Sequence, residues 1–237
     1  TVLTDEAEMA AAVGIVHTPP SIQSGAMFNR PTDVAVHPTT GDIFITDGYG
    51  NSRVHRLTAD GSHVLSWGKA GTDPGCFNLP HNVAVHPDLE HVMVADRENQ
   101  RVQIFTLDGT FVDQWHAHRA VAVTVGGNTN GEKDIFIAEQ GSTSRVQQGG
   151  GFNDLPSWTA GIGHRIGVYT GEGKMVNQLG AGTVGERPEQ FNWLHSVAID
   201  SFGDVYAAEV SFCECGKHQN PVPREMVSLR KWCRNKA

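Results

Sequence analysis

The stretch FNRPTDVAVHPTTGDIFITD begins at Phe28, and FNLPHNVAVHPDLEHVMVAD begins at Phe77, 49 positions later. Each stretch holds an apolar alternating run, a polar turn containing Pro and Asp, and a second apolar run that ends at Asp. Alternation with a period of two predicts β-strands, and the polar turn predicts that the two strands pair antiparallel. The two stretches therefore indicate a repeated unit built from antiparallel strands.

Two further copies continue the repeat: FNWLHSVAIDSFGDVYAAEV from Phe191 and the weaker HAHRAVAVTVGGNTNGEKDIFIAEQ from His116. Four strands in a unit of about 40 to 50 residues are typical of a β-propeller blade. Two more strands follow in the first three units. The third strand is expected after Arg53, Arg101 or Arg145, and the fourth is expected to end near Trp67, Trp115 or Leu179. The sequence thus predicts an all-β propeller with about four visible blades over residues 28–237. Residues 1–27 are left as a loop, a short helix or the remnant of a preceding blade.

The composition indicates a folded globular protein and argues against nucleic-acid-binding and membrane-spanning classes. Charged residues make up 19% and hydrophobic residues 39% of the 237, as in a folded globular protein. The net charge of −8 without a basic cluster argues against a nucleic-acid surface. The sequence contains no run of about 18 apolar residues, so no membrane-spanning segment is expected. Four cysteines are expected either to stay unpaired or to form one disulfide between the C-x-C pair and the last cysteine: Cys76, Cys213, Cys215 and Cys233.

Histidine recurs at one position of the repeat. The residue that enters the innermost strand of each blade lies at the mouth of a propeller's channel, and here it is Thr32, His81, Arg119 or His195. His81 and His195 occupy alternate blades, so rotation of the repeat brings both imidazoles toward one axis, where they could share a metal. A single histidine is more often structural. His37 and His86, in the VAVHP turns, are expected to be solvated and to have no metal role.

The copies of the repeat differ just after the Asp that they share, where one copy has Gly48-Tyr49 and another has Arg97-Glu98. The shared Asp, Asn and Arg residues are interpreted as blade scaffolding. Tyr49 and Arg97 are expected on loops above the channel, where variation can build a site. Two plainer interpretations stay open: Tyr49 caps its loop, and Arg97 pairs with a neighbouring carboxylate such as Glu98.

The segments FNRPTDVAVHPTTGDIFITDGYGNSRV, FNLPHNVAVHP and VADRENQRVQIF resemble peptidyl-α-hydroxyglycine α-amidating lyase, a family of NHL-repeat propellers. The resemblance is specific over residues 28–115 and weaker but in register to Trp232, where REMVSLRKW resembles a closing strand. It implies a six-bladed parent, so that two N-terminal blades have no counterpart here. A protein partner could supply those blades.

The resemblance implies a zinc ion with His81 and His195 as ligands, Tyr49 as the catalytic tyrosine and Arg97 as one of two active-site arginines. A third histidine and the second arginine belong to the blades without a counterpart. The family's calcium ligand after the last histidine is replaced here by Ser196, which weakens the expectation of calcium. The family also favours a secreted, periplasmic or luminal location.

The implied function is cleavage of the carbinolamide C–N bond of a peptide with a C-terminal α-hydroxyglycine, giving an amide and glyoxylate. Two alternatives stand beside it. One is another metal-dependent lyase or hydrolase on the same scaffold, because a fold does not fix a function. The other is a non-catalytic NHL propeller that acts as a protein-binding or structural module, which the missing histidine and arginine favour.

Overall fold

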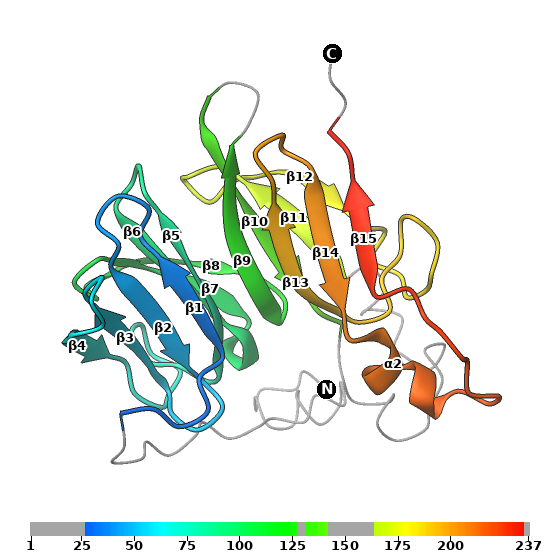
Figure 1. Ribbon diagram of the computed structural model, residues 1–237, viewed down its shortest axis with the longest axis horizontal. Helices are drawn as coiled ribbons and strands as arrows, with labels where there is room; N and C mark the ends of the chain where they lie inside the picture. Colours follow the sequence, from blue (N-terminus) through cyan, green and yellow to red (C-terminus); the bar gives the residue numbers. More distant parts are fainter. Residues whose placement is uncertain (1–26, 128–130, 142–163, 235–237) are drawn as a thin grey trace, which may run out of the picture.

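The computed structural model describes residues 27–127, 131–141 and 164–234. Its strands form four separate antiparallel sheets, which follow one another from the blue β1 to the red β15 (Figure 1). The innermost strands β1, β5, β9 and β13 pack against one another in chain order. This is a β-propeller architecture with one sheet per blade, as the repeat predicts. Apart from Met27, the N-terminal segment lies outside the described residues.

Strands within each blade pair in chain order, each with the next. Blades one and two consist of β1 (Asp33–Val36), β2 (Ile43–Asp47), β3 (Arg53–Leu57) and β4 (His63–Trp67), then β5 (Pro80–His86), β6 (His91–Asp96), β7 (Arg101–Thr106) and β8 (Phe111–His116). Blades three and four consist of β9 (Ala120–Gly127), β10 (Lys133–Glu139), β11 (Arg165–Tyr169) and β12 (Met175–Leu179), then β13 (Leu194–Ile199), β14 (Val205–Glu209) and β15 (Leu229–Trp232). Within the described residues the last blade therefore has three strands where the repeat predicts four.

Blade three differs from the expectation at its third strand. That strand was placed after Arg145, which lies outside the described residues, and it begins at Arg165 instead. The physical reason is that the apolar alternating run RIGVY, which supplies the side chains that a blade strand buries, begins at Arg165.

The hydrophobic core lies between neighbouring blades, and the sheets of blades two and three are buried on both faces. Val83 and Val85 of β5 pack toward Phe44 of blade one. The alternate residues Ala84 and Met93 pack toward blade three. Blades three and four repeat the arrangement in their own shared cluster. Alternation along a strand therefore assigns successive side chains to the preceding and the following blade.

Blade one has an uncovered face. Val34 and Val36 occupy the repeat positions of Val83 and Val85, which are 4% and 8% exposed against blade one. Their own side chains are 56% and 58% exposed. The apolar face of β1 is therefore a blade-to-blade surface that no described residue covers. We call it the open face of blade one.

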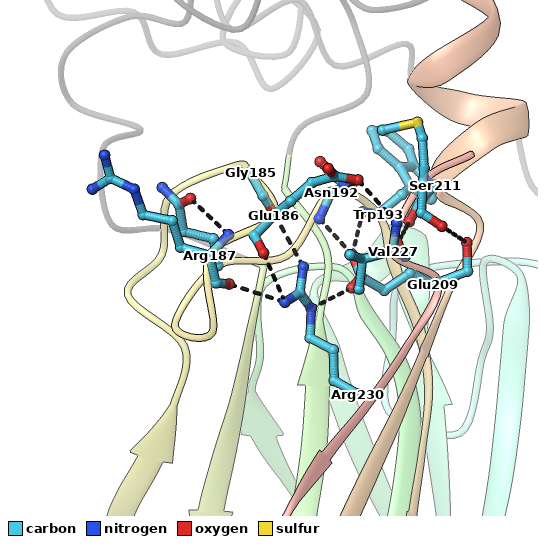
Figure 2. A network of polar contacts seen from close by, with 12 residues as sticks. Gly185, Glu186, Arg187, Asn192, Trp193, Glu209, Ser211, Val227 and Arg230 are labelled. Atoms are coloured by element: carbon cyan, nitrogen blue, oxygen red, sulfur yellow. Dashed lines mark hydrogen bonds and ion pairs between the residues drawn. The ribbon is translucent and has the colours of Figure 1, made fainter. Parts of the chain in front are cut away.

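A carboxylate at the end of each second strand holds the blade together. Asp96 accepts hydrogen bonds from the backbone N–H of Asn78 and from Arg101 Nε, each at 2.8 Å. Figure 2 shows the corresponding network in blade four, where Arg230 Nε donates to Glu209 at 2.6 Å and its NH1 donates to the Arg187 carbonyl at 2.9 Å. Because the carboxylate fastens both the entry to the first strand and the start of the third, its scaffold role agrees with the sequence interpretation.

The histidines of the VAVHP turns are buried, not solvated as expected. His37 is 1% and His86 4% exposed. The Nδ1 of His37 accepts the backbone N–H groups of Thr39 and Thr40, each at 3.2 Å. A ring nitrogen that satisfies turn N–H groups lets the imidazole enter the blade edge without leaving polar groups unpaired.

Two short helical segments, α2 (Ser211–Glu214) and η5 (Gly216–His218), follow β14. All four cysteines are free thiols. The described residues contain no helix with the length and apolar character needed to span a bilayer.

Candidate active site

The four site residues expected from the sequence lie at one end of the blades. His81 and His195 are the second residues of β5 and β13. Tyr49 follows the end of β2, and Arg97 follows the end of β6 in the 3₁₀ turn η1 (Arg97–Asn99). Because the first and second strands of a blade are antiparallel, the start of one and the end of the other meet at the same edge of the sheet. The propeller repeat thus brings residues from three blades together.

Both histidines sit in β-bulges. The pairing of β5 with β6 shifts between Pro80 and Asn82, and the pairing of β13 with β14 shifts between Leu194 and Ser196. His81 and His195 are the extra residues at these shifts. A bulge redirects a side chain that regular alternation would send to one face of the sheet. Here it frees the two imidazoles from the blade faces.

His81 connects the site to its surroundings through both ring nitrogens. Its Nδ1 lies 2.7 Å from the carbonyl oxygen of Val121, which only accepts hydrogen bonds, so Nδ1 carries the proton. Its Nε2 lies 3.2 Å from the Tyr49 hydroxyl and accepts that O–H. The ring centroids of His81 and His195 are 4.9 Å apart. The His81 ring therefore contacts both Tyr49 and His195, while Tyr49 keeps 44% of its surface exposed.

The electrostatic field at the site keeps the imidazoles neutral. Burial, the charge of Arg97 and the neighbouring His195 together lower the pKa of His81 to about 3. Burial and Arg97 also lower the pKa of His195. The charge of Arg97 thus acts on both rings. Neutral imidazoles are the form that binds a metal ion.

Arg97 belongs to an Arg–Glu–Arg cluster. Its Nε donates to Glu98 at 2.8 Å, which is the pairing that the plainer interpretation expected. Arg119, immediately before β9, places both terminal nitrogens 3.3 Å from the same carboxylate. The side chains of Glu98 and Arg119 are only 4% and 5% exposed. Arg97 therefore shares its acidic partner with Arg119, and its charge also acts on both histidines.

The donors at the site fit zinc in chemical type and in proximity. His81 offers the Nε2 lone pair, and its Nδ1–H is held by a carbonyl, which is the usual outer support of a metal-bound histidine. The two histidines are fewer than the three protein ligands that a catalytic zinc usually takes. The described residues contain no group of three His, Cys, Asp or Glu side chains arranged to hold a metal. The Tyr49 hydroxyl also occupies the lone pair that a metal would need.

Two members of the site were not assigned a role from the sequence. Arg119 was placed at the channel mouth with His81 and His195 but without a function, and Glu98 was considered only as a partner of Arg97. Their shared ion pair joins residues 21 positions apart, on neighbouring blades. The repeat register was the available signal, since Arg119 occupies the position that carries histidine in the blades on either side.

The fold and the comparisons define the class of protein: a β-propeller that contains NHL repeats. The NHL repeat model matches residues 28–57 and 77–105, which are parts of blades one and two. Among solved structures, hydrazine synthase from Kuenenia stuttgartiensis matches 79% of this chain and 44% of its own, with a TM-score of 0.52 and 16% identity. That similarity concerns the fold alone.

Over about a third of its length the chain is similar to peptide-amidating enzymes. Peptidylglycine alpha-amidating monooxygenase of Rattus norvegicus is 46% identical over 85 residues, which are 34% of this chain and 9% of the rat protein. Peptidyl-alpha-hydroxyglycine alpha-amidating lyase 1 of Drosophila melanogaster is 40% identical over 103 residues, 39% of this chain and 19% of the fly protein. A probable lyase of the same name from Caenorhabditis elegans is 45% identical over 83 residues, 34% of this chain and 23% of its own. The chain thus spans less than a quarter of each of these relatives, and the resemblance to the amidating lyases is confirmed over that part.

Proposed function

We propose that the protein is a lyase of the amidating type, which releases glyoxylate from a peptide ending in α-hydroxyglycine. One observation carries the proposal: the Tyr49 hydroxyl lies 3.2 Å from His81 Nε2, the centroid of the His195 ring is 4.9 Å from that of His81, and the charge of Arg97 acts on both rings. A base, two imidazoles and a guanidinium in one place are what elimination from a carbinolamide carboxylate requires. The names of the fly and worm relatives supply the substrate class.

The proposed reaction is R-CO-NH-CH(OH)-COO⁻ giving R-CO-NH₂ and OHC-COO⁻. A base removes the hydroxyl proton, the oxygen electron pair forms the C=O bond of glyoxylate, and the C–N bond breaks. The amide nitrogen then takes up a proton, so no water is consumed. Tyr49 is proposed as the base because its hydroxyl lies beside the two imidazoles and the residue is 44% exposed. Arg97 is proposed to grip the substrate carboxylate, since only its Nε is hydrogen-bonded, to Glu98, within the described residues.

Zinc is proposed as the cofactor, with His81 and His195 as ligands and a third ligand from outside the described residues. When bound, zinc lowers the pKa of a coordinated hydroxyl and so eases its deprotonation. The experiment on this point is the metal content of the purified protein. His81→Ala combined with His195→Ala should abolish zinc binding while circular dichroism shows an unchanged β fold. His91→Ala, a histidine on β6 at the opposite end from His81, is the matched control. Unchanged zinc content in the double variant would reject the ligand assignment.

The proposed reaction is tested by incubating the full chain, with zinc present, with an α-hydroxyglycine peptide and measuring glyoxylate. Release above the spontaneous rate supports the lyase. Absence of release from a protein that is folded and loaded with zinc contradicts it.

A second proposal concerns the partner. The open face of blade one carries Val34 and Val36 at positions that are buried in blade two by the blade beside it. We propose that a further β-blade, from outside residues 28–237, covers this face in the working protein. Native mass spectrometry of protein isolated from its natural source should then show a species heavier than the 25.6 kDa of this chain. A species of that mass alone would contradict the proposal.

A further inference from the structure

The junction between blades one and two, the first junction, is bridged by a cation of the chain itself. Arg56 of β3 pairs with Asp42 through its Nε at 2.8 Å, and its guanidinium carbon lies 5.8 Å from the centre of the Phe44 ring. Its NH1 donates to the carbonyl oxygen of Leu107 in blade two at 3.0 Å. The apolar stem and charged end of Arg56 therefore reach from one blade to the next.

The junction between blades two and three, the second junction, lacks this cation. In blade one, Arg56 pairs with Phe44 across β3 and β2. In blade two, Ile104 pairs with Met93 at the same register across β7 and β6. Ile104 therefore holds the place of Arg56. Isoleucine is shorter than arginine and carries no charge, so the second junction has no side chain that bridges it in the same way.

The opposite side of the second junction is also a smaller residue. Thr106 and Thr170 open turns with the same backbone hydrogen bonds, so Gly171 in blade three takes the turn position of Leu107 in blade two. A cavity of about 200 Å³ lies here, and both Ile104 and Gly171 line it. The cavity therefore occupies the space where the first junction has the longer side chains.

The cavity is lined by apolar side chains together with two carboxylates. Met93, Ile135 and Trp115 are apolar members, and Asp113 and Glu172 are exposed acidic members. Among the described residues, no lysine or arginine forms an ion pair with either carboxylate. Asp113 Oδ2 accepts the indole N–H of Trp115 at 3.1 Å, so a carboxylate lies beside an aromatic ring. A cation on an apolar stem is complementary to this combination.

We propose that the cavity of the second junction binds a small organic cation with an apolar stem, of the alkylguanidinium type, in the place that the Arg56 side chain holds in the first junction. The stem packs on the apolar side chains, and Asp113 and Glu172 balance the charge. The Gly171 carbonyl, as the counterpart of the Leu107 acceptor, takes a hydrogen bond from the cation.

The proposed cation site is separate from the candidate active site. His86 and His91 line the cavity and lie at the end of β5 and the start of β6, whereas His81 lies at the opposite end of β5. Burial lowers the pKa of His86, so its ring adds no positive charge at neutral pH. The cation site is therefore independent of the proposed lyase reaction.

The experiment titrates the full chain with butylguanidinium at pH 8, where imidazoles are uncharged, and follows binding by calorimetry. Butylurea, which has nearly the same shape and no charge, is the comparison. Butylguanidinium should bind at least about tenfold more tightly, because the carboxylates and the indole interact with its charge. Absence of butylguanidinium binding would overturn the site, and equal affinities would overturn the assignment to a cation.

Gly171→Leu tests the location of the site. It introduces the side chain that the first junction has and should abolish butylguanidinium binding by filling the cavity. A Cβ atom at position 171 would meet the flexible end of Leu89 at 3.1 Å, which can move aside. Ala59→Leu, at the same turn position on blade one, is the control and should bind as the unmodified protein does. Unchanged affinity in Gly171→Leu would contradict the proposed location.

Asp113→Asn tests the charge. It should weaken butylguanidinium binding about threefold or more, while asparagine keeps an oxygen that accepts the Trp115 indole N–H. Asp60→Asn removes an equal charge from an exposed turn of blade one and should leave binding unchanged. Because Asp113 is exposed, this variant decides the question if circular dichroism shows that Gly171→Leu does not fold. Equal affinity of Asp113→Asn and the unmodified protein would overturn the role of the carboxylate.

The source of the cation is tested with a short peptide that has a central arginine and blocked ends. It should bind more weakly than butylguanidinium, because the cavity accommodates a stem and not a backbone. Tighter binding of the peptide would overturn the assignment to a free small molecule in favour of an arginine from a partner protein.

Discussion

At the scale of the residue, Tyr49 is the group whose role can be isolated most cleanly. Among the described residues, its hydroxyl makes one hydrogen bond, to His81 Nε2, and its ring packs edge-on against the His81 ring. Substitution by phenylalanine removes the oxygen and keeps the ring contact. Effects of that change on the reaction therefore report on the hydroxyl.

Tyr49→Phe should lower the rate of glyoxylate release by about 10² to 10⁴, the usual contribution of a general base. The unfolding free energy should fall by only about 1 kcal/mol, because the ring contact is kept and a single hydrogen bond to His81 is lost. Steady-state kinetics and denaturant titration check the two parts. Tyr206→Phe, on blade four, is the control. A rate that survives Tyr49→Phe would leave the activity and discard the base.

Two other histidines, His118 and His164, make stability depend on pH. Burial lowers the pKa of His118 to about 4 and that of His164 to about 3. In the unfolded chain both take up a proton near pH 6.5. The unfolded state therefore binds more protons below pH 6.5, and the stability of the fold falls as pH decreases from there toward 4.

The slope should be up to about 1.4 kcal/mol per pH unit for each histidine. Urea titrations at pH 7 and pH 5 measure it. His118→Gln should flatten the dependence, because glutamine does not titrate in this range. The same loss of stability in the variant and in the unmodified protein would show that other groups dominate.

At the scale of the element, the burial of a blade's apolar face depends on whether a neighbouring blade covers it. Val34 and Val83 hold the same position of the repeat, one uncovered and one buried. Aspartate at position 83 places a charge between two blades, whereas aspartate at position 34 places it in solvent. The two substitutions are therefore matched in sequence context and opposite in burial.

Val83→Asp should destabilise the chain by more than about 3 kcal/mol, since an unpaired buried charge is costly. Val34→Asp should change stability by less than about 1 kcal/mol in the chain alone. Denaturant titration of both variants tests this. A large loss in Val34→Asp would mean that something covers the open face in solution, which supports the additional blade.

The elements also show what sequence reasoning reaches. The period-two runs and the turn residues sufficed to predict the strands of the blades, because the alternation of apolar and polar residues along a strand is visible in the sequence. The bulges at His81 and His195 were not predicted, since an extra residue in one strand is defined by its pairing with the next. Burial of His37 and His86 was missed for a related reason: the turn N–H groups that satisfy their rings are backbone groups. The start of β11 was misplaced because an arginine alone does not mark a strand.

The candidate site was predicted in part. His81, His195, Tyr49 and Arg97 were named from the repeat register and from the family resemblance, and the structure brings them together. The ion pair of Glu98 with Arg119 could not be derived, because it joins two blades through side chains that have no periodic relation. No period in the sequence reports a contact between residues of different blades at the channel mouth.

At the scale of the whole molecule, the blades pack as a linear series. Blades two and three have neighbours on both sides, whereas blades one and four have one described neighbour each. In such arrays each unit is stabilised by its own contacts and those of its immediate neighbours. Opening is therefore expected to begin at the ends.

Amide hydrogen exchange should be slowest in β6, β7 and β10 and faster in β3, β4 and β15. Mass spectrometry of peptic fragments after exchange measures it. Equal protection in all blades would show that the series opens only as a unit, as it would if a further blade joined its two ends.

The position of the candidate site gives this linear arrangement a consequence. Tyr49 comes from blade one, His81 and Arg97 from blade two, Arg119 from blade three and His195 from blade four. A ligand that contacts these site residues links four blades, each of which otherwise packs only against its neighbours. Its binding energy adds to the stability of the native state by mass action, and it does so most for the outer blades, which have the fewest other restraints. Loss of order in either outer blade would in turn remove a site residue, so ligand binding at the site and the order of the outer blades are thermodynamically linked.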